Sequence, residues 1–106
     1  MSQQIQPSLN DLRTAVQRAC QPTTARYIIE GRKRIAEMPR SWVLANIMQT
    51  ARECLNLSDY WEYGRLLEVL HEIEATELLK ELVFVGLKSD DVDVRDMAEI
   101  WAEKGI

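Results

Sequence analysis

The sequence is poor in residues that interrupt or crosslink a chain, with three prolines, four glycines and two cysteines among 106 residues. Cys20 and Cys54 have no CxxC spacing and are too few for a disulfide framework. No apolar run approaches the roughly 18 residues of a membrane span. The first residues also lack the basic and then apolar layout of a signal peptide. We therefore expect one cytoplasmic domain with no membrane partner.

Enzyme chemistry also has few candidate residues. His71 is the single histidine, so a serine or cysteine nucleophile has no other ordinary base. Glu68 precedes His71 by three residues, as in di-iron carboxylate bundles, but those sites need two such motifs. The four glycines stand apart, which excludes a phosphate-binding glycine loop. We expect no enzyme, no catalytic residue, no metal site and no cofactor.

Apolar residues recur at helical spacing in almost every segment between the breakers, and no segment alternates for long with the period of a strand. The pattern predicts an all-α domain over residues 1–106, with a flexible N-terminus at 1–7. It contains six short antiparallel helices joined by turns of two to four residues. These helices would form three hairpins, at about 8–38, 41–74 and 76–104, arranged as a solenoid or an orthogonal bundle.

Two of the expected helices have unusual sequence features. Gly31 lies inside the helix expected over 24–37, where glycine costs roughly 1 kcal/mol relative to alanine, and this indicates a close helix approach or a kink. The helix expected over 76–88 is apolar on most sides, so we expect it to be central and covered by several neighbours.

The last two hairpins resemble each other and a known repeat. A shift of 31 residues aligns Ser58-Asp59 with Ser89-Asp90, as two copies of one unit would. The stretch from Leu87 to Trp101, with its Asp-rich turn followed by Val94-Arg95 and Ala98, resembles the turn and second helix of HEAT-like repeats. This resemblance implies a stacked helical-hairpin protein whose relatives mostly bind other macromolecules, sometimes as small adaptors or immunity proteins.

Charge is distributed unevenly. Residues 1–40 carry seven basic and three acidic side chains, whereas residues 41–106 carry six basic and fourteen acidic ones. The basic side chains that could spread over the outward side of the second helix are Arg26, Lys33, Arg34 and Arg40. They could engage phosphates of a nucleic acid, contact an acidic protein, or form a solvated face paired with Glu30 and Glu37. The net negative charge of the whole chain makes nucleic acid the less favoured partner.

Aromatic residues fall off the apolar stripes of their helices. Trp61 lies on the side of its helix that also carries Arg65 and Glu68, and Phe84 lies among charged residues of the next helix. Trp and Tyr ringed by charges are typical of interface hot spots. The sequence thus predicts a protein-binding surface that includes Trp61, Arg65, Glu68 and Phe84. Its partner would be another protein, basic in one version of the hypothesis, or a second copy of the chain.

A layered fold offers a second interpretation, because each helix of a solenoid buries two faces. Trp61, Phe84 and Trp42 would then fill a second packing layer instead of facing a partner. Trp101 lies on the apolar stripe of its own helix, and we assign it to the core.

Overall fold

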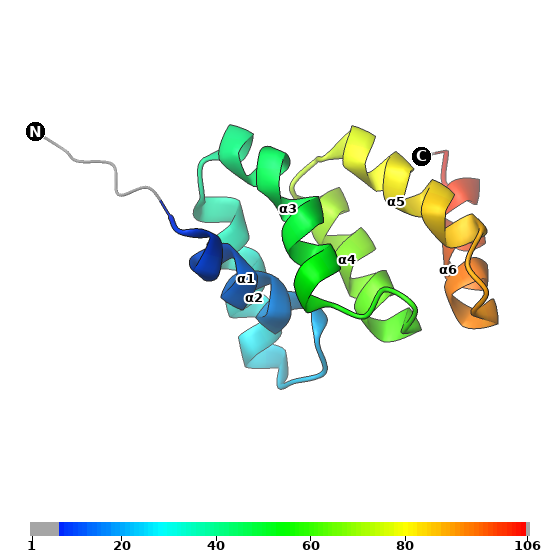
Figure 1. Cartoon of the computed structure of the whole chain (residues 1–106), viewed down its shortest axis with the longest axis horizontal. Coiled ribbons are helices and arrows are strands. Elements are labelled where there is room, and N and C mark those ends of the chain that lie inside the picture. The colour runs from blue at the N-terminus through cyan, green and yellow to red at the C-terminus, as the bar shows by residue number, and fades with distance from the viewer. Residues whose placement is uncertain (1–6, 106) are drawn as a thin grey trace, which may run out of the picture.

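The computed structural model describes residues 7–105, and within them the chain forms helices and no strand, which confirms the all-α prediction (Figure 1). The predicted flexible segment 1–7 lies, except for Pro7, outside the described residues. The six helices of this range are α1 (Leu9–Cys20), α2 (Ala25–Glu37), α3 (Arg40–Cys54), α4 (Tyr60–Glu72), α5 (Thr76–Leu87) and α6 (Val92–Glu103).

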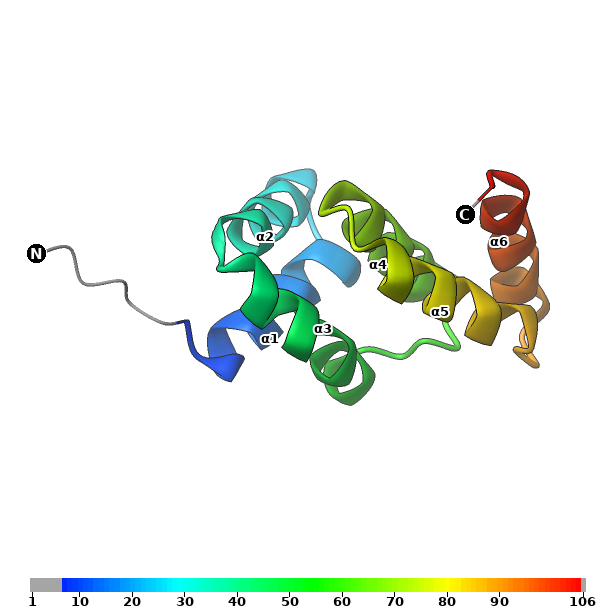
Figure 2. The same cartoon turned by 90° about the horizontal axis from the view of Figure 1, so that it is seen from above.

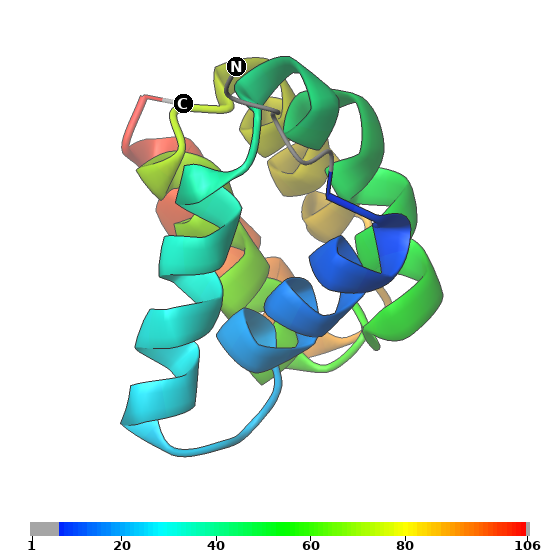
Figure 3. The same ribbon diagram turned by 90° about the vertical axis from the view of Figure 1, so that its left-hand side faces the viewer.

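The helices follow one another along the long axis, from α1 and α2 at one end to α6 at the other (Figure 2). α1 packs against α2, α3 and α4, and it lies between α2 and α3 when the molecule is seen from that end (Figure 3). α4 packs against α5 and α6. The helices α1 and α4 are therefore the two around which the fold is built.

The segment 41–74 differs from the expected hairpin. α3 packs mainly against α1, and α4 packs against α1, α5 and α6. The connection between them runs from Leu55 to Asp59, which is longer than the expected tight turns and lets α4 diverge from α3. Each helix then buries its apolar stripe against α1.

The core is formed by apolar side chains that recur at helical spacing within the helices. α1 buries Leu12, Val16 and Ala19, and α4 buries a wide face that includes Leu66 and Leu70. Trp101 is 8% exposed and belongs to the core, as predicted. Burial on this scale contributes about 1.5–3 kcal/mol for each large aliphatic or aromatic side chain, which is the main stabilising term of such a domain.

Gly31 marks the closest helix contact. A Cβ built on Gly31 would lie 2.7 Å from the carbonyl oxygen of Ala15 and 2.7 Å from the amide nitrogen of Ala19, both in α1. The position therefore reflects a close helix approach, one of the two alternatives that the sequence indicates. Only a residue without a Cβ allows the α1 and α2 backbones to lie so near.

Three of the helices in residues 7–105 begin at an acidic or hydroxyl side chain that caps them, namely α1, α4 and α6. Ser8 and Asp11 form a reciprocal capping box at α1. Asp59 caps α4 and Asp91 caps α6, each by accepting backbone N–H groups of the first turn. α3 begins at Arg40 directly after Pro39, so Ser41 lies within the helix.

α5 is less covered than its composition predicts. Leu79, Leu82 and Val83 are buried, but Phe84, Val85 and Leu87 are exposed. The expectation of a central helix is wrong because α5 packs mainly against α4 and α6, which together cover one side of it. The other side of α5 leaves apolar side chains in contact with solvent.

Candidate binding surfaces

Three of the four predicted partner-binding residues lie together on the outer side of α4. The Arg65 guanidinium stacks over the Trp61 ring at 4.3 Å from its centroid. An Nη atom of Arg65 also lies 3.4 Å from a carboxylate oxygen of Glu68, three residues further along the helix. We call Trp61, Arg65 and Glu68 the α4 cluster. Its geometry matches the helical spacing from which the sequence predicts it.

Arg32 of α2 contacts the α4 cluster, although the sequence pattern does not predict this contact. Its Nη2 lies 3.2 Å from Glu68 and its Nη1 lies 3.4 Å from Glu72, while its side chain is only 21% exposed. The sequence places Arg32 in a basic run, where its direction on α2 is not visible. Two glutamates four residues apart on α4 were the signal that a cation from another helix could bridge them.

The α4 cluster is thus partly an internal brace between α2 and α4. The Nε1 atom of Trp61 and the Nε atom of Arg32 are buried and have no hydrogen-bond acceptor among residues 7–105. Trp61 as a whole is half-buried, which lies between the two sequence interpretations. By contrast, Trp42 packs against the core with its ring partly covered, as the second-layer interpretation predicts.

Phe84 belongs to a different surface. Phe84 is 57% exposed, and the Nζ of Lys88 lies 4.1 Å from its ring centroid. The ring lines a cavity of about 810 Å³ formed by the C-terminal half of α5, the start of α6 and the connection that contains Leu57. The α4 cluster lies against α2, so the structure does not bring Phe84 to it.

The cavity beside Phe84 has apolar walls and an acidic rim. Val85, which is 52% exposed, extends the apolar wall, and Asp90 and Asp91 line the edge. Tyr63 lies at its base, where its hydroxyl donates a 2.8 Å hydrogen bond to the Leu82 carbonyl oxygen. Burial raises the pKa of Tyr63 to about 12. We call this cavity the α5 pocket.

The four basic residues predicted for phosphate contact do not form one free surface. Arg26 pairs with Glu30, and Lys33 pairs with Glu37, each one helical turn away. Arg34 is exposed and lines a shallow cavity with Asp11. The pKa of Asp11 is lowered first by hydrogen bonds from Ser8, with a smaller contribution from the Arg34 charge. The arrangement resembles the solvated, paired helix face that the sequence left open.

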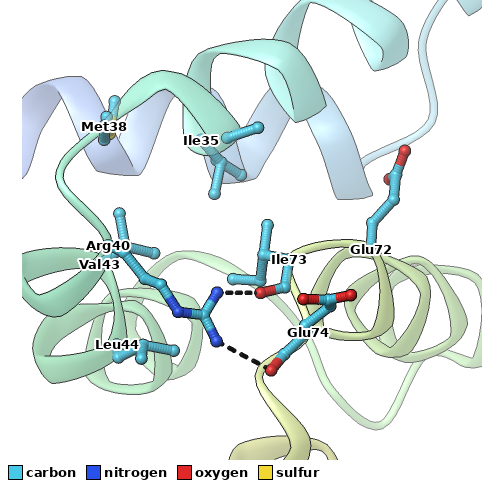
Figure 4. A pocket seen from close by; sticks show the side chains of 9 residues that line it. Ile35, Met38, Arg40, Val43, Leu44, Glu72, Ile73 and Glu74 are labelled. Atoms are coloured by element: carbon cyan, nitrogen blue, oxygen red, sulfur yellow. Dashed lines mark hydrogen bonds between the residues drawn. The ribbon is translucent and has the colours of Figure 1, made fainter.

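Arg40 has a structural role at the end of α4 (Figure 4). Its guanidinium donates hydrogen bonds to the carbonyl oxygens of Ile73 and Glu74, the latter at 3.0 Å. A cation at this position is favourable because the C-terminus of a helix carries a partial negative charge. The guanidinium borders a cavity of about 280 Å³ that is walled by apolar residues of α2, α3 and α4, such as Ile35, Val43 and Ile73.

Arg40→Ala is expected to lower the free energy of unfolding by about 1 kcal/mol, because it leaves two helix-end carbonyl groups without their donor. Arg26→Ala is the matched control, since it removes a basic residue whose side chain is 84% exposed and should cost at most about 0.5 kcal/mol. Urea unfolding followed by circular dichroism measures both. Equal midpoints for the two variants would contradict the structural role of Arg40.

The two cysteines and the histidine, the other residues that could take part in catalysis or metal binding, are packed against neighbouring residues. Cys20 is buried, which raises the pKa of its thiol to about 12, and desolvation also raises the pKa of Cys54. His71 packs edge-on against Trp101 with ring centroids 5.6 Å apart. Among residues 7–105 there is no group of three or more side chains that could hold a metal ion.

Comparisons with protein-family models, with curated proteins and with solved structures find no match to this chain. None of the helices between residues 7 and 105 is long and apolar enough to cross a membrane. The fold itself defines the class: an all-α protein of short packed helices, with an apolar pocket on α5 and a charged brace between α2 and α4.

Proposed function

We propose that this chain is a small protein-binding module without chemistry of its own, of the adaptor or immunity type. It engages a partner protein through the α5 pocket, with Phe84 as the central contact. The observation that carries the proposal is the exposure of Phe84 and Val85 at the wall of an 810 Å³ cavity. Exposed apolar side chains grouped around a concave surface are typical of protein-interaction sites.

The energetics of this surface favour a macromolecular partner. Covering a half-exposed phenylalanine contributes on the order of 1–2 kcal/mol, and the neighbouring Val85 adds a similar apolar contact. Truncating an aromatic side chain at the centre of an interface typically costs about 2 kcal/mol or more of binding free energy. The base of the pocket is held by the Tyr63 hydrogen bond, so little ordering entropy is lost on binding.

The α4 cluster has a secondary place in the proposal. Trp61, Arg65 and Glu68 stay partly accessible, so a large partner that covers one side of the molecule could touch them. Their contacts with each other and with Arg32 already satisfy most of their charges. We therefore assign the main binding energy to Phe84 and a bracing role to the α4 cluster.

The test compares single alanine variants as baits in a quantitative pull-down from the native host. Phe84→Ala is expected to keep the thermal midpoint within a few degrees and to abolish capture of the partner. Leu9→Ala is the matched control, because Leu9 is also 57% exposed but lies on α1 at the other end of the molecule, and it should capture normally. Trp61→Ala should lower stability and reduce capture less than Phe84→Ala.

Two outcomes would contradict the proposal. Capture by Phe84→Ala equal to that of the unsubstituted chain would remove the α5 pocket as the contact. Loss of capture in Trp61→Ala alone, with an unchanged thermal midpoint, would transfer the interaction to the α4 cluster.

A further inference from the structure

We infer that the segment that docks in the α5 pocket is basic: an apolar side chain beside Phe84, flanked by lysine or arginine residues that meet the acidic rim. This inference rests on the proposed function and names the chemistry of the partner. It comes from the uneven pairing of charges along the structure, which is independent of the exposed apolar side chains.

Carboxylates in the first four helices are already satisfied. Each one from Asp11 to Glu72 has an ion-pair or hydrogen-bond partner within the described residues. The acidic side chains in this group are Asp11, Glu30, Glu37, Glu53, Asp59, Glu62, Glu68 and Glu72. These groups attract a partner's cation less strongly than an unpaired carboxylate does, because a neighbouring cation or N–H group already compensates part of their charge.

In the α5–α6 hairpin, by contrast, most carboxylates have no partner in the part of the chain that the structure describes. Residues 76–104 carry eight acidic and four basic side chains. Within residues 7–105, Glu81 pairs with Arg52 and Asp91 caps α6, but the other carboxylates have no ion pair or side-chain hydrogen bond. These unpaired groups are Glu77, Asp90, Asp93, Asp96, Glu99 and Glu103. Uncompensated negative charge is thus concentrated on the hairpin that forms most of the α5 pocket.

The basic side chains nearest the pocket do not neutralise it. Lys88 lies over the Phe84 ring, and Arg95 donates a hydrogen bond to the Ser89 carbonyl oxygen. Asp90, at the rim, keeps a free carboxylate with no basic partner in the described range. A lysine or arginine brought by the docking segment would find an acceptor there without breaking an existing pair.

A second copy of the chain is poorly suited to supply these cations. Most of its own basic side chains outside the hairpin already contact carboxylates, backbone carbonyl oxygens or aromatic rings. The residues engaged in this way are Arg13, Arg18, Arg26, Arg32, Lys33, Arg40, Arg52 and Arg65. Self-association would therefore bring paired charges to an unpaired acidic surface, whereas a different, basic protein would complete the pairing.

The experiment selects a displayed random peptide library against the full chain at low ionic strength. Enriched peptides are expected to combine an apolar or aromatic residue with lysine or arginine and to lose binding to Phe84→Ala. Affinity for the best peptide should fall about threefold to fivefold in Asp90→Asn, which removes one exposed ion pair at the rim, and should fall with added salt. Glu103→Gln is the matched control, because it removes an equally unpaired carboxylate at the far end of α6 and should change affinity less than about twofold.

The outcomes separate the inference from the proposed function. Enriched peptides that need Phe84 but are neutral or acidic would overturn the inference and leave the α5 pocket as a docking site. The absence of any enriched peptide that depends on Phe84 would contradict the proposed function itself. A dimer in sedimentation equilibrium that Phe84→Ala dissociates would also overturn the inference, because the occupant would then be a second copy.

Discussion

Gly31→Ala is expected to lower the free energy of unfolding by about 2 kcal/mol and the thermal midpoint by roughly 10 °C. The added Cβ would meet two backbone atoms of α1 at 2.7 Å, the carbonyl oxygen of Ala15 and the amide nitrogen of Ala19. Backbone atoms cannot turn aside as a side chain can, so α1 and α2 would have to separate along their contact. The gain of about 1 kcal/mol from replacing a helical glycine offsets only part of this cost.

Gly64→Ala is the control for this prediction, because it makes the same exchange inside α4. Its Cβ would meet only Met97, whose methyl carbon lies 3.2 Å away at the end of a flexible side chain. We expect an increase of about 0.5 kcal/mol, since Met97 can move and the helix gains propensity. Calorimetry of both variants measures the difference. A change in the free energy of unfolding with the same sign in both variants would contradict the close α1–α2 contact.

Gly86→Ala is expected to destabilise the domain by about 3 kcal/mol through a clash with a side chain that cannot move away. The added Cβ would overlap the hydroxyl group of Tyr63 and lie 2.9 Å from the Cβ of Ala98. Tyr63 is 1% exposed and its hydroxyl donates to the Leu82 carbonyl oxygen. Urea unfolding should show the loss, together with a decrease in near-ultraviolet circular dichroism from the displaced ring.

A double-variant cycle with Tyr63→Phe tests the cause. Tyr63→Phe alone should cost about 1 kcal/mol, because it removes one buried hydrogen bond. The double variant Tyr63→Phe/Gly86→Ala should lose less stability than the sum of the single effects, since the hydroxyl that meets the new Cβ is gone, but the relief is partial because the ring carbon Cζ of residue 63 still meets it. Strict additivity would show that the hydroxyl group is not the cause of the Gly86→Ala loss.

These glycines connect stability to the proposed binding surface. Gly86 and Tyr63 both line the α5 pocket, so the contact that fixes α5 on α4 also shapes the site next to Phe84. A partner that binds there would contact one of the most constrained parts of the fold. Preorganised sites of this kind bind with a smaller loss of conformational entropy than mobile ones.

Local features of the fold could be read from the sequence because they depend on neighbours in the chain. The recurrence of apolar residues at helical spacing predicts the six helices, and the same rule places Trp101 in the core. Helical spacing also brings Trp61, Arg65 and Glu68 together, since residues three to four positions apart share one side of a helix. No knowledge of the other helices is needed for these predictions.

Pairing between helices could not be read in this way. The bridge from Arg32 to Glu68 and Glu72 depends on how α2 is rotated against α4, over a separation of 36 residues in the chain to Glu68. The apolar composition of α5 predicts burial, but it does not tell how many neighbours are available to cover that helix. Phe84 and Val85 are exposed for this reason.

The sequence by itself determined an all-α chain, the approximate position of each helix and the excess of acidic residues after residue 40, whereas the contact with α1 that requires glycine at position 31 came from the tertiary structure. The helix positions follow from periodicity and capping, which act over a few residues. Only the tertiary structure decided that α3 packs on α1, that Arg40 is held at the end of α4, and that Phe84 lines a pocket separate from Trp61. The physical reason is that helix rotation and neighbour number come from packing the whole set of apolar stripes at once.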